Sequence, residues 1–189
     1  FGRAGRNEDA DLILFNTCAV RENAELKVYG KLGALKHIKR RKPSLKICLC
    51  GCMTQQEHIS DGIKKRYPHV DLIFGTHSIY KIPELLYGIY KGERVFDYAP
   101  SDGRIAEGIP GIREFSYKAG VSVMYGCNNF CTYCIVPYVR GRERSRKPED
   151  IISEIKRLAE DGVTEIMLLG QNVNSYGLDL EGDTDFADI

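Results

Sequence analysis

The sequence predicts an α/β protein in which parallel strands form two domains. Short apolar runs alternate with longer stretches of helical periodicity, as in sheets that are covered on both faces. A segment rich in Gly and Pro, residues 98–118, interrupts this alternation, which then restarts. We therefore predict a first domain over residues 1–97, a linker over 98–118 and a second domain over 119–189.

The first domain is predicted to be a small parallel sheet with helical crossovers. Its strands are three short, nearly continuous apolar runs at residues 11–16, 46–51 and 70–74. Stretches with apolar residues on one helical stripe lie between and after them, at about residues 22–40, 56–66 and 83–90. Pro43 follows the first helix, which proline cannot continue, and Pro83 lies near the start of the third.

The second domain is predicted to contain one βαβ unit. Its first strand covers residues 120–125 and leads into a long loop. Pro148 opens a helix with a clear apolar face, and Gly162 is the expected cap. The next strand covers residues 166–169, and we expect one of its edges to stay unpaired.

Composition and charge exclude several classes of protein. The 189 residues are 43% hydrophobic and carry 27 basic against 26 acidic side chains, so a uniformly basic nucleic-acid coat is excluded. No apolar run approaches the roughly 20 residues of a membrane span, and there is no secretory signal, so we expect a cytoplasmic protein without a membrane partner. The chain starts at Phe1 rather than Met, and we expect a fragment. Seven cysteines without a secretion signal favour metal or thiol chemistry over disulfides.

The strongest motif is a cysteine cluster directly after the predicted strand 120–125. Cys127, Cys131 and Cys134 follow a C-x3-C-x2-C spacing in a loop at the carboxyl end of a strand, where α/β sheets place their chemistry. A closed zinc site needs four ligands, and residues 121–189 contain no histidine. A four-iron cluster on three cysteines keeps one iron open to a small chelating ligand. Two alternatives stay open, namely three buried thiols and a zinc site completed from the first domain.

Two further cysteines each follow a predicted strand of the first domain. Cys18 comes directly after residues 11–16 and Thr17, and Cys52 follows residues 46–51. Since the carboxyl ends of parallel strands lie at one edge of a sheet, we expect Cys18 and Cys52 to converge there.

The cysteine loop, with Tyr133 before its last cysteine, resembles that of the radical S-adenosylmethionine (SAM) superfamily. This resemblance implies that Cys127, Cys131 and Cys134 hold a [4Fe-4S] cluster. It further implies that the amino and carboxylate groups of SAM chelate the fourth iron, and that SAM cleavage gives a 5′-deoxyadenosyl radical.

Taken with the segments around Cys18 and Cys52, the chain closely resembles the methylthiotransferase branch of that superfamily. The resemblance implies a second, auxiliary [4Fe-4S] cluster held by three cysteines, with Cys18 and Cys52 as two of them and the other upstream of Phe1. It also implies that residues 119–189 are the first βαβ part of a radical SAM (β/α) partial barrel.

The same resemblance implies an activity and its partners. The expected reaction is methylthiolation of tRNA at C2 of N6-isopentenyladenosine next to the anticodon, with two SAM molecules and two [4Fe-4S] clusters. The expected partners are the tRNA anticodon stem-loop, SAM and an electron donor such as a flavodoxin or ferredoxin, and the expected state is a monomer. We expect the fragment alone to be inactive. Alternatives are a transferase for N6-threonylcarbamoyladenosine or for a ribosomal-protein aspartate, and a non-enzymatic iron–sulfur or zinc module.

Other residues near the cysteine loop complete the predicted site. A basic segment between the loop and the helix is predicted to contact substrate phosphate or the SAM carboxylate, through Arg140, Arg142, Arg144 and Arg146. A solvated surface loop is the alternative for this segment. The resemblance places four residues beside SAM as cofactor-binding residues, Tyr133, Gly170, Gln171 and Asn172. Ordinary turn chemistry is the alternative for residues 170–172.

Two cysteines match no ligand position of the family. Cys48 and Cys50 alternate with Leu49 on a predicted strand, so both side chains point to one face. We interpret them as core residues, because free cysteine is among the most buried residue types. The alternative is that Cys50 replaces the third ligand of the auxiliary cluster.

Overall fold

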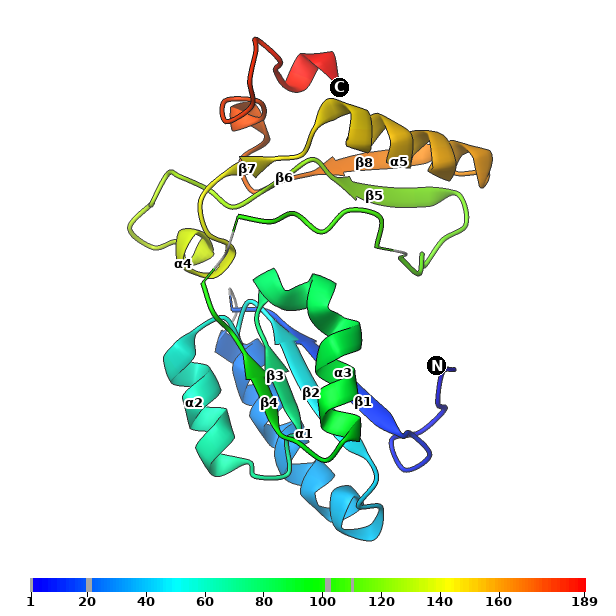
Figure 1. Cartoon of the computed structure of the whole chain (residues 1–189), viewed down its shortest axis with the longest axis vertical. Helices are drawn as coiled ribbons and strands as arrows, with labels where there is room; N and C mark the ends of the chain where they lie inside the picture. Colours follow the sequence, from blue (N-terminus) through cyan, green and yellow to red (C-terminus); the bar gives the residue numbers. More distant parts are fainter. Residues whose placement is uncertain (1, 20–21, 101–102, 110) are drawn as a thin grey trace. The chain divides into compact units, whose positions relative to one another are not determined.

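The computed structural model describes residues 2–19, 22–100, 103–109 and 111–189 (Figure 1). The chain divides into two compact units, Phe1–Pro100 and Ser101–Ile189. Each unit combines helices with parallel strands, which confirms the predicted α/β class. The two units are described separately below.

The first unit is built on a four-stranded parallel sheet in the order β1-β2-β3-β4. The strands are β1 (Leu12–Thr17), β2 (Lys46–Gly51), β3 (Leu72–Phe74) and β4 (Val95–Asp97). The first three correspond to the predicted strands. The fourth was not predicted, because three residues are too few to show a periodicity and β4 is recognisable only by its pairing with β3.

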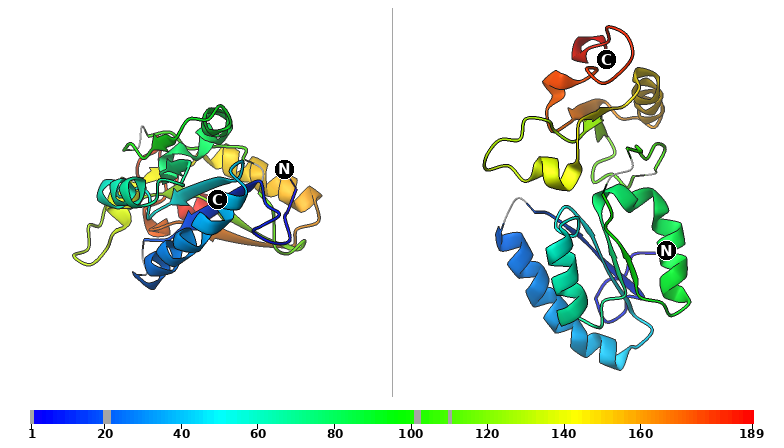
Figure 2. Two further views of the ribbon diagram at one scale, coloured as in Figure 1. Left: turned by 90° about the horizontal axis from the view of Figure 1, so that it is seen from below. Right: turned by 60° about the vertical axis from the view of Figure 1, so that its left-hand side comes forward.

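Helices cover both faces of this sheet, as the right-hand view of Figure 2 shows. One face packs against α1 (Glu22–Arg41) and α2 (Glu57–Arg66), with a core that includes Leu32, Ile47, Leu49, Ile63 and Ile73. The opposite face packs against α3 (Ile82–Tyr90), which follows the 3-10 helix η1 (Thr76–Lys81). The core on that side includes Cys48, Cys50, Leu72, Phe74, Leu85 and Ile89. Cys48 and Cys50 therefore share one face and are buried, as their alternation with Leu49 predicted.

The second unit contains the predicted βαβ connection. The strands β5 (Lys118–Ser122) and β8 (Glu165–Leu169) pair in parallel, and α5 (Pro148–Glu160) links them. The predicted strand 120–125 is divided in two, because the chain leaves β8 after Val123, whose N–H donates to Leu169 O at 2.8 Å. The second part, β6 (Met124–Tyr125), pairs antiparallel with β7 (Arg144–Ser145).

The stretch between β6 and α5 is less irregular than predicted. It contains the short helix α4 (Val136–Arg140) as well as β7. The chain after β8 forms two 3-10 helices, η2 (Val173–Ser175) and η3 (Phe186–Asp188). Tyr176, between them, is buried in the core of the unit, and its hydroxyl donates to Arg146 O at 2.8 Å.

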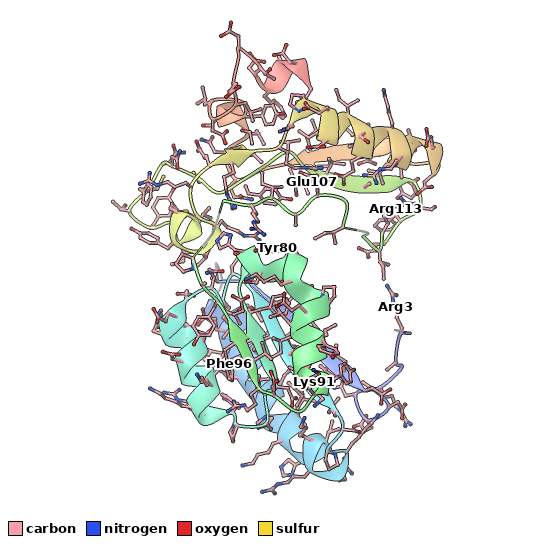
Figure 3. The ribbon with its side chains drawn as sticks, viewed as in Figure 1. Arg3, Tyr80, Lys91, Phe96, Glu107 and Arg113 are labelled. Atoms are coloured by element: carbon pink, nitrogen blue, oxygen red, sulfur yellow. The ribbon has the colours of Figure 1, made fainter. Side chains whose placement is uncertain are left out.

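Residues predicted as linker make hydrogen bonds in each unit. In the first, the carbonyls of Tyr98 and Ala99 accept from Gln55 Nε2 at 3.0 and 2.9 Å. In the second, Glu107, which is labelled in Figure 3, accepts a hydrogen bond from Arg146. The exact extent of the linker stays a prediction. Within the described ranges, no helix has the length and apolar character needed to cross a membrane.

Candidate functional site

The cysteine loop starts at a backbone position that only glycine suits. Gly126 has a φ of +79°, and a β-carbon added there would lie 2.0 Å from Arg142 O. The next residue, Cys127, donates its N–H to Gly141 O at 3.2 Å and is 8% exposed. The start of the loop is thus fixed against the backbone of residues 141–142.

The other two cysteines lie at the two ends of a turn. Cys134 N–H donates to Cys131 O at 2.9 Å, which brings the Cα atoms of these residues within about 7 Å. Cys131 is exposed and Cys134 is partly exposed. Phe130, directly before the turn, has a φ of +45° and is the non-glycine residue with positive φ in the described part of the chain.

The donor set fits an iron–sulfur cluster, although the loop does not yet bring its thiols to one point. Among the described residues, no three His, Cys, Asp or Glu side chains are grouped closely enough to hold a metal ion. Three thiols in eight residues are the softest donors that a protein offers, and they suit iron–sulfur clusters. Cys131 and Cys134 share one turn, and Cys127 lies at the fixed start of the same loop, so all three thiols belong to one short segment of the second unit.

Aromatic side chains hold part of the basic segment against the loop. The Arg142 guanidinium lies over the Phe130 ring at 4.7 Å, and Tyr138 contacts the same ring edge-on at 5.9 Å. Arg144 donates to the carbonyl oxygens of Arg140 and Arg104, at 3.0 and 3.2 Å.

Arg146 occupies a different environment from the rest of the basic segment. Its side chain is 5% exposed, and it binds Glu107 through two nitrogens and Glu154 at 2.7 Å. Burial of the guanidinium opposes its charge, but the hydrogen bonds that it donates to these two carboxylates outweigh burial and raise the pKa of Arg146. Arg146 N–H and one guanidinium nitrogen also donate to Val123 O and Ser122 O. Arg146 is therefore held inside the second unit by two ion pairs, and its predicted substrate contact stays a prediction.

The segment after β8 lies beside the start of the cysteine loop. Gln171 Oε1 accepts a hydrogen bond from Gly126 N–H at 2.6 Å. Asn172 Nδ2 donates to Glu143 Oε1 at 3.1 Å and to Ser175 Oγ at 2.6 Å. Gly170 packs closely against Met124, since a β-carbon there would lie 2.7 Å from Met124 Cγ. Tyr133, the fourth residue predicted to bind the cofactor, is 91% exposed.

Glu143 is a site residue that sequence reasoning missed. Its carboxylate accepts from Asn128 N–H at 3.1 Å and from Asn128 Nδ2 at 3.3 Å, besides the bond from Asn172. The available signal was its position as the one acid between Arg140 and Lys147. That signal was read only as part of the charge of the segment.

In the first unit, the structure places Cys18 and Cys52 directly after two paired strand ends. Thr17 and Gly51 are partners in the parallel ladder, and Cys52 N–H donates to Thr17 O at 3.0 Å. Gly51 has a φ of +104°, and a β-carbon there would lie 2.3 Å from Thr17 O. Cys18 is exposed and Cys52 is buried. The tight approach of β1 and β2 thus brings the two cysteines to one edge of the sheet.

The other two cysteines of this unit are poor candidates for metal ligands. Burial raises the pKa of Cys50 to about 11. Burial, with smaller contributions from Asp71 and Cys50, raises the pKa of Cys48 to about 12. Both thiols lie among apolar core side chains, where burial disfavours the thiolate form that a metal ligand supplies.

Comparison with known proteins assigns both halves of the chain. Residues 1–75 match the model of the uncharacterized protein family UPF0004, and residues 121–185 match that of the radical SAM superfamily. The chain is 59% identical over 183 residues to the tRNA-2-methylthio-N(6)-dimethylallyladenosine synthase of Clostridioides difficile, covering 96% of this chain and 38% of that protein. It is 57% identical over 190 residues to the synthase of the same name from Clostridium tetani, covering 100% of this chain and 42% of that protein.

The chain is thus similar to radical SAM methylthiotransferases over nearly its whole length. This confirms the resemblance that the cysteine motifs carried. The cysteine loop lies in the part that matches the radical SAM model, and Cys18 and Cys52 lie in the part that matches UPF0004. The chain spans between 38% and 42% of the length of the curated relatives named above.

Proposed function

We propose that the protein is a radical SAM methylthiotransferase that modifies tRNA at C2 of N6-isopentenyladenosine next to the anticodon. The observation that carries this proposal is the identity of 59% to a synthase whose name states this product, over 96% of this chain. The three-cysteine loop at the end of β6 supplies the matching chemistry.

Within this proposal, Cys127, Cys131 and Cys134 hold the SAM-binding cluster as thiolates. A [4Fe-4S] cluster bound there supplies the electron that cleaves SAM to a 5′-deoxyadenosyl radical. The hydrogen bonds of Gly126 and Cys127 fix one end of the loop, and the Cys131–Cys134 turn brings in the other two thiolates. Gly170, Gln171 and Asn172 border the same end of the unit, where they orient SAM, and the exposed Tyr133 closes over it.

Cys18 and Cys52 hold the auxiliary [4Fe-4S] cluster together with a third cysteine. The register of β1 and β2 supports this role, since it places both cysteines at adjacent strand ends. Cys50 is left out of this ligand set, because its side chain lies in the core that packs against α3.

The basic segment contacts the anticodon stem-loop through Arg140, Arg142 and Arg144. Arg142 supports this role because it is exposed while its guanidinium lies over the Phe130 ring, which leaves its N–H groups accessible to phosphate oxygens. Such contacts release counterions from RNA, so binding weakens as salt rises.

The remaining features of the proposal come from the family. Each reaction uses two SAM molecules, the electron donor is a flavodoxin or ferredoxin, and the protein works as a cytoplasmic monomer.

The decisive experiment is anaerobic reconstitution of the chain with iron and sulfide, followed by electron paramagnetic resonance of the reduced sample with and without SAM. A four-iron signal that shifts with SAM, is lost in Cys131→Ala and survives in Asn129→Ala supports the proposal. Asn129 is an exposed neighbour in the same loop, so its variant controls for general disturbance. Stoichiometric zinc, or a cluster indifferent to SAM, would instead favour a non-enzymatic metal module.

A further inference from the structure

Glu143 lies where three segments of the second unit meet. Its carboxylate accepts hydrogen bonds from the backbone and side-chain nitrogens of Asn128, in the cysteine loop. It also accepts from Asn172 Nδ2, in the segment after β8. In return, Glu143 N–H donates to Asn128 Oδ1 at 3.2 Å. Three hydrogen bonds thus join Glu143 and Asn128, of which Asn128 donates two and Glu143 donates one.

This pair determines where the first cysteine of the loop lies. Asn128 directly follows Cys127, whose own N–H is bound to Gly141 O. Residues 127 and 128 are therefore attached at successive positions to residues 141 and 143. Beyond Asn128 the loop is exposed as far as Tyr133, including Cys131. The carboxylate is thus the last point at which the loop is fixed before its exposed part begins.

The chemistry of Glu143 suits this task better than that of a surface charge. A carboxylate is an acceptor on both oxygens, so it can take two N–H groups from Asn128 and one from Asn172 at the same time. A glutamine at this position would offer only one accepting oxygen. Its NH2 group would replace the second oxygen and would face an N–H donor, so no hydrogen bond could form there. The arginines on either side of Glu143 in sequence do not need it as a partner, because Arg142 lies over Phe130 and Arg144 binds backbone carbonyls.

We propose that Glu143 is a positioning residue for the SAM-binding cluster. Through Asn128 it holds Cys127 in place before iron arrives. Through Asn172 it keeps the segment proposed to orient SAM in register with the cysteine loop. This inference rests on the proposed function for its iron–sulfur readout, but the arrangement of the metal-free loop can be tested without it.

The first test measures alkylation of individual cysteines by iodoacetamide in the metal-free 189-residue chain, followed by mass spectrometry. In Glu143→Gln, Cys127 should react about tenfold faster than in the wild type, while Cys131 should change less than twofold, because only Cys127 depends on hydrogen bonds of this pair. The matched control is Glu160→Gln, which removes the same charge from an exposed position at the end of α5. An unchanged Cys127 rate in Glu143→Gln would overturn the inference.

A rescue variant separates positioning from general stability. Asn128→Asp combined with Glu143→Gln exchanges the two roles, so that the amide introduced at position 143 donates to the carboxylate introduced at position 128. In the double variant, the alkylation rate of Cys127 should therefore return toward the slow rate of the wild type. Asn128→Asp alone places two carboxylates together and should raise the rate at least as much as Glu143→Gln. Double and single variants that react alike would contradict the pairing. Thermal unfolding of every variant identifies any general loss of structure.

Cluster assembly gives the second readout. After reconstitution, Glu143→Gln should take up iron several-fold more slowly than the wild type and give an altered electron paramagnetic resonance shift with SAM, and the double variant should recover both. If the wild type assembles no cluster, the proposed function fails, whereas the alkylation results still decide the role of Glu143 in the metal-free loop. If the wild type assembles its cluster and Glu143→Gln matches it in rate and signal, the positioning role is wrong and the proposed function stands.

Discussion

At the scale of single residues, Arg146 shows how burial changes the role of a charged side chain. Four arginines alternate along residues 140–146, yet this one is enclosed by Glu107 and Glu154 and is 5% exposed. Arg146→Met would leave two carboxylates without their cation, so we expect roughly 3–5 kcal/mol loss of unfolding free energy. Chemical denaturation measures the loss, and Arg140→Met in the same segment should change it far less. Equal effects would contradict the distinction.

Cys48 provides a pH-dependent prediction at the same scale. Burial raises the pKa of its thiol from 9.0 to about 12. Above pH 9 the unfolded chain releases this proton while the folded chain retains it, so the contribution to stability is complete below pH 9 and is lost as pH rises toward 12. We expect the unfolding free energy of Cys48→Val to fall less steeply with alkaline pH than that of the wild type, by up to about 1.4 kcal/mol per pH unit. Denaturant titrations between pH 8 and about 11 measure the difference. If the unfolding free energies of the variant and the wild type changed with pH in parallel, the pKa of Cys48 would not be raised.

At the scale of elements, the junction between β6 and the cysteine loop depends on a close backbone approach. Gly126 and Gly162 both have positive φ, but only Gly126 faces a neighbouring carbonyl, at 2.0 Å from an added β-carbon. Gly162→Ala should cost about 1–2 kcal/mol from strain in φ alone. Gly126→Ala should lower the unfolding free energy by more than this, because the backbone of residues 141–142 must move. It should also lower the iron content after reconstitution. Calorimetry and iron analysis of both variants test this, and comparable behaviour would mean that the contact relaxes freely.

At the scale of the whole molecule, the second unit offers one βαβ connection and an incomplete sheet. In the described part of the chain, β8 pairs with β5 alone, and Met167 and Leu169 on β8 are 49% and 42% exposed. The radical in the proposed reaction needs an enclosed substrate site, since accessible C–H and S–H groups other than the substrate would quench it. We expect the 189-residue chain to bind a cluster but not to methylthiolate tRNA. Mass spectrometry of nucleosides from tRNA treated with SAM and reductant checks this, and detection of the 2-methylthio product would overturn it.

Several features of this protein could be read from the sequence with little ambiguity. The apolar runs located three of the four strands of the first unit, and the alternation around Leu49 placed Cys48 and Cys50 on one buried face. The spacing of Cys127, Cys131 and Cys134 pointed to the radical SAM superfamily, which the family model confirms. These inferences succeed because strand periodicity and ligand spacing are local, so a few consecutive residues carry them.

What the sequence by itself determined is therefore the fold class, the family and the candidate ligands. The tertiary structure alone decided how the residues around those ligands are used. In the folded unit, Arg146 is buried and forms ion pairs with Glu107 and Glu154. Glu143 accepts hydrogen bonds from Asn128 and Asn172, and Gly126 allows β6 to lie close to residues 141–142. Apart from the pair of Arg146 with Glu154, these contacts connect residues that lie 15 to 39 positions apart in the chain. No local pattern encodes them, because they form only where packing of the whole unit brings the segments together.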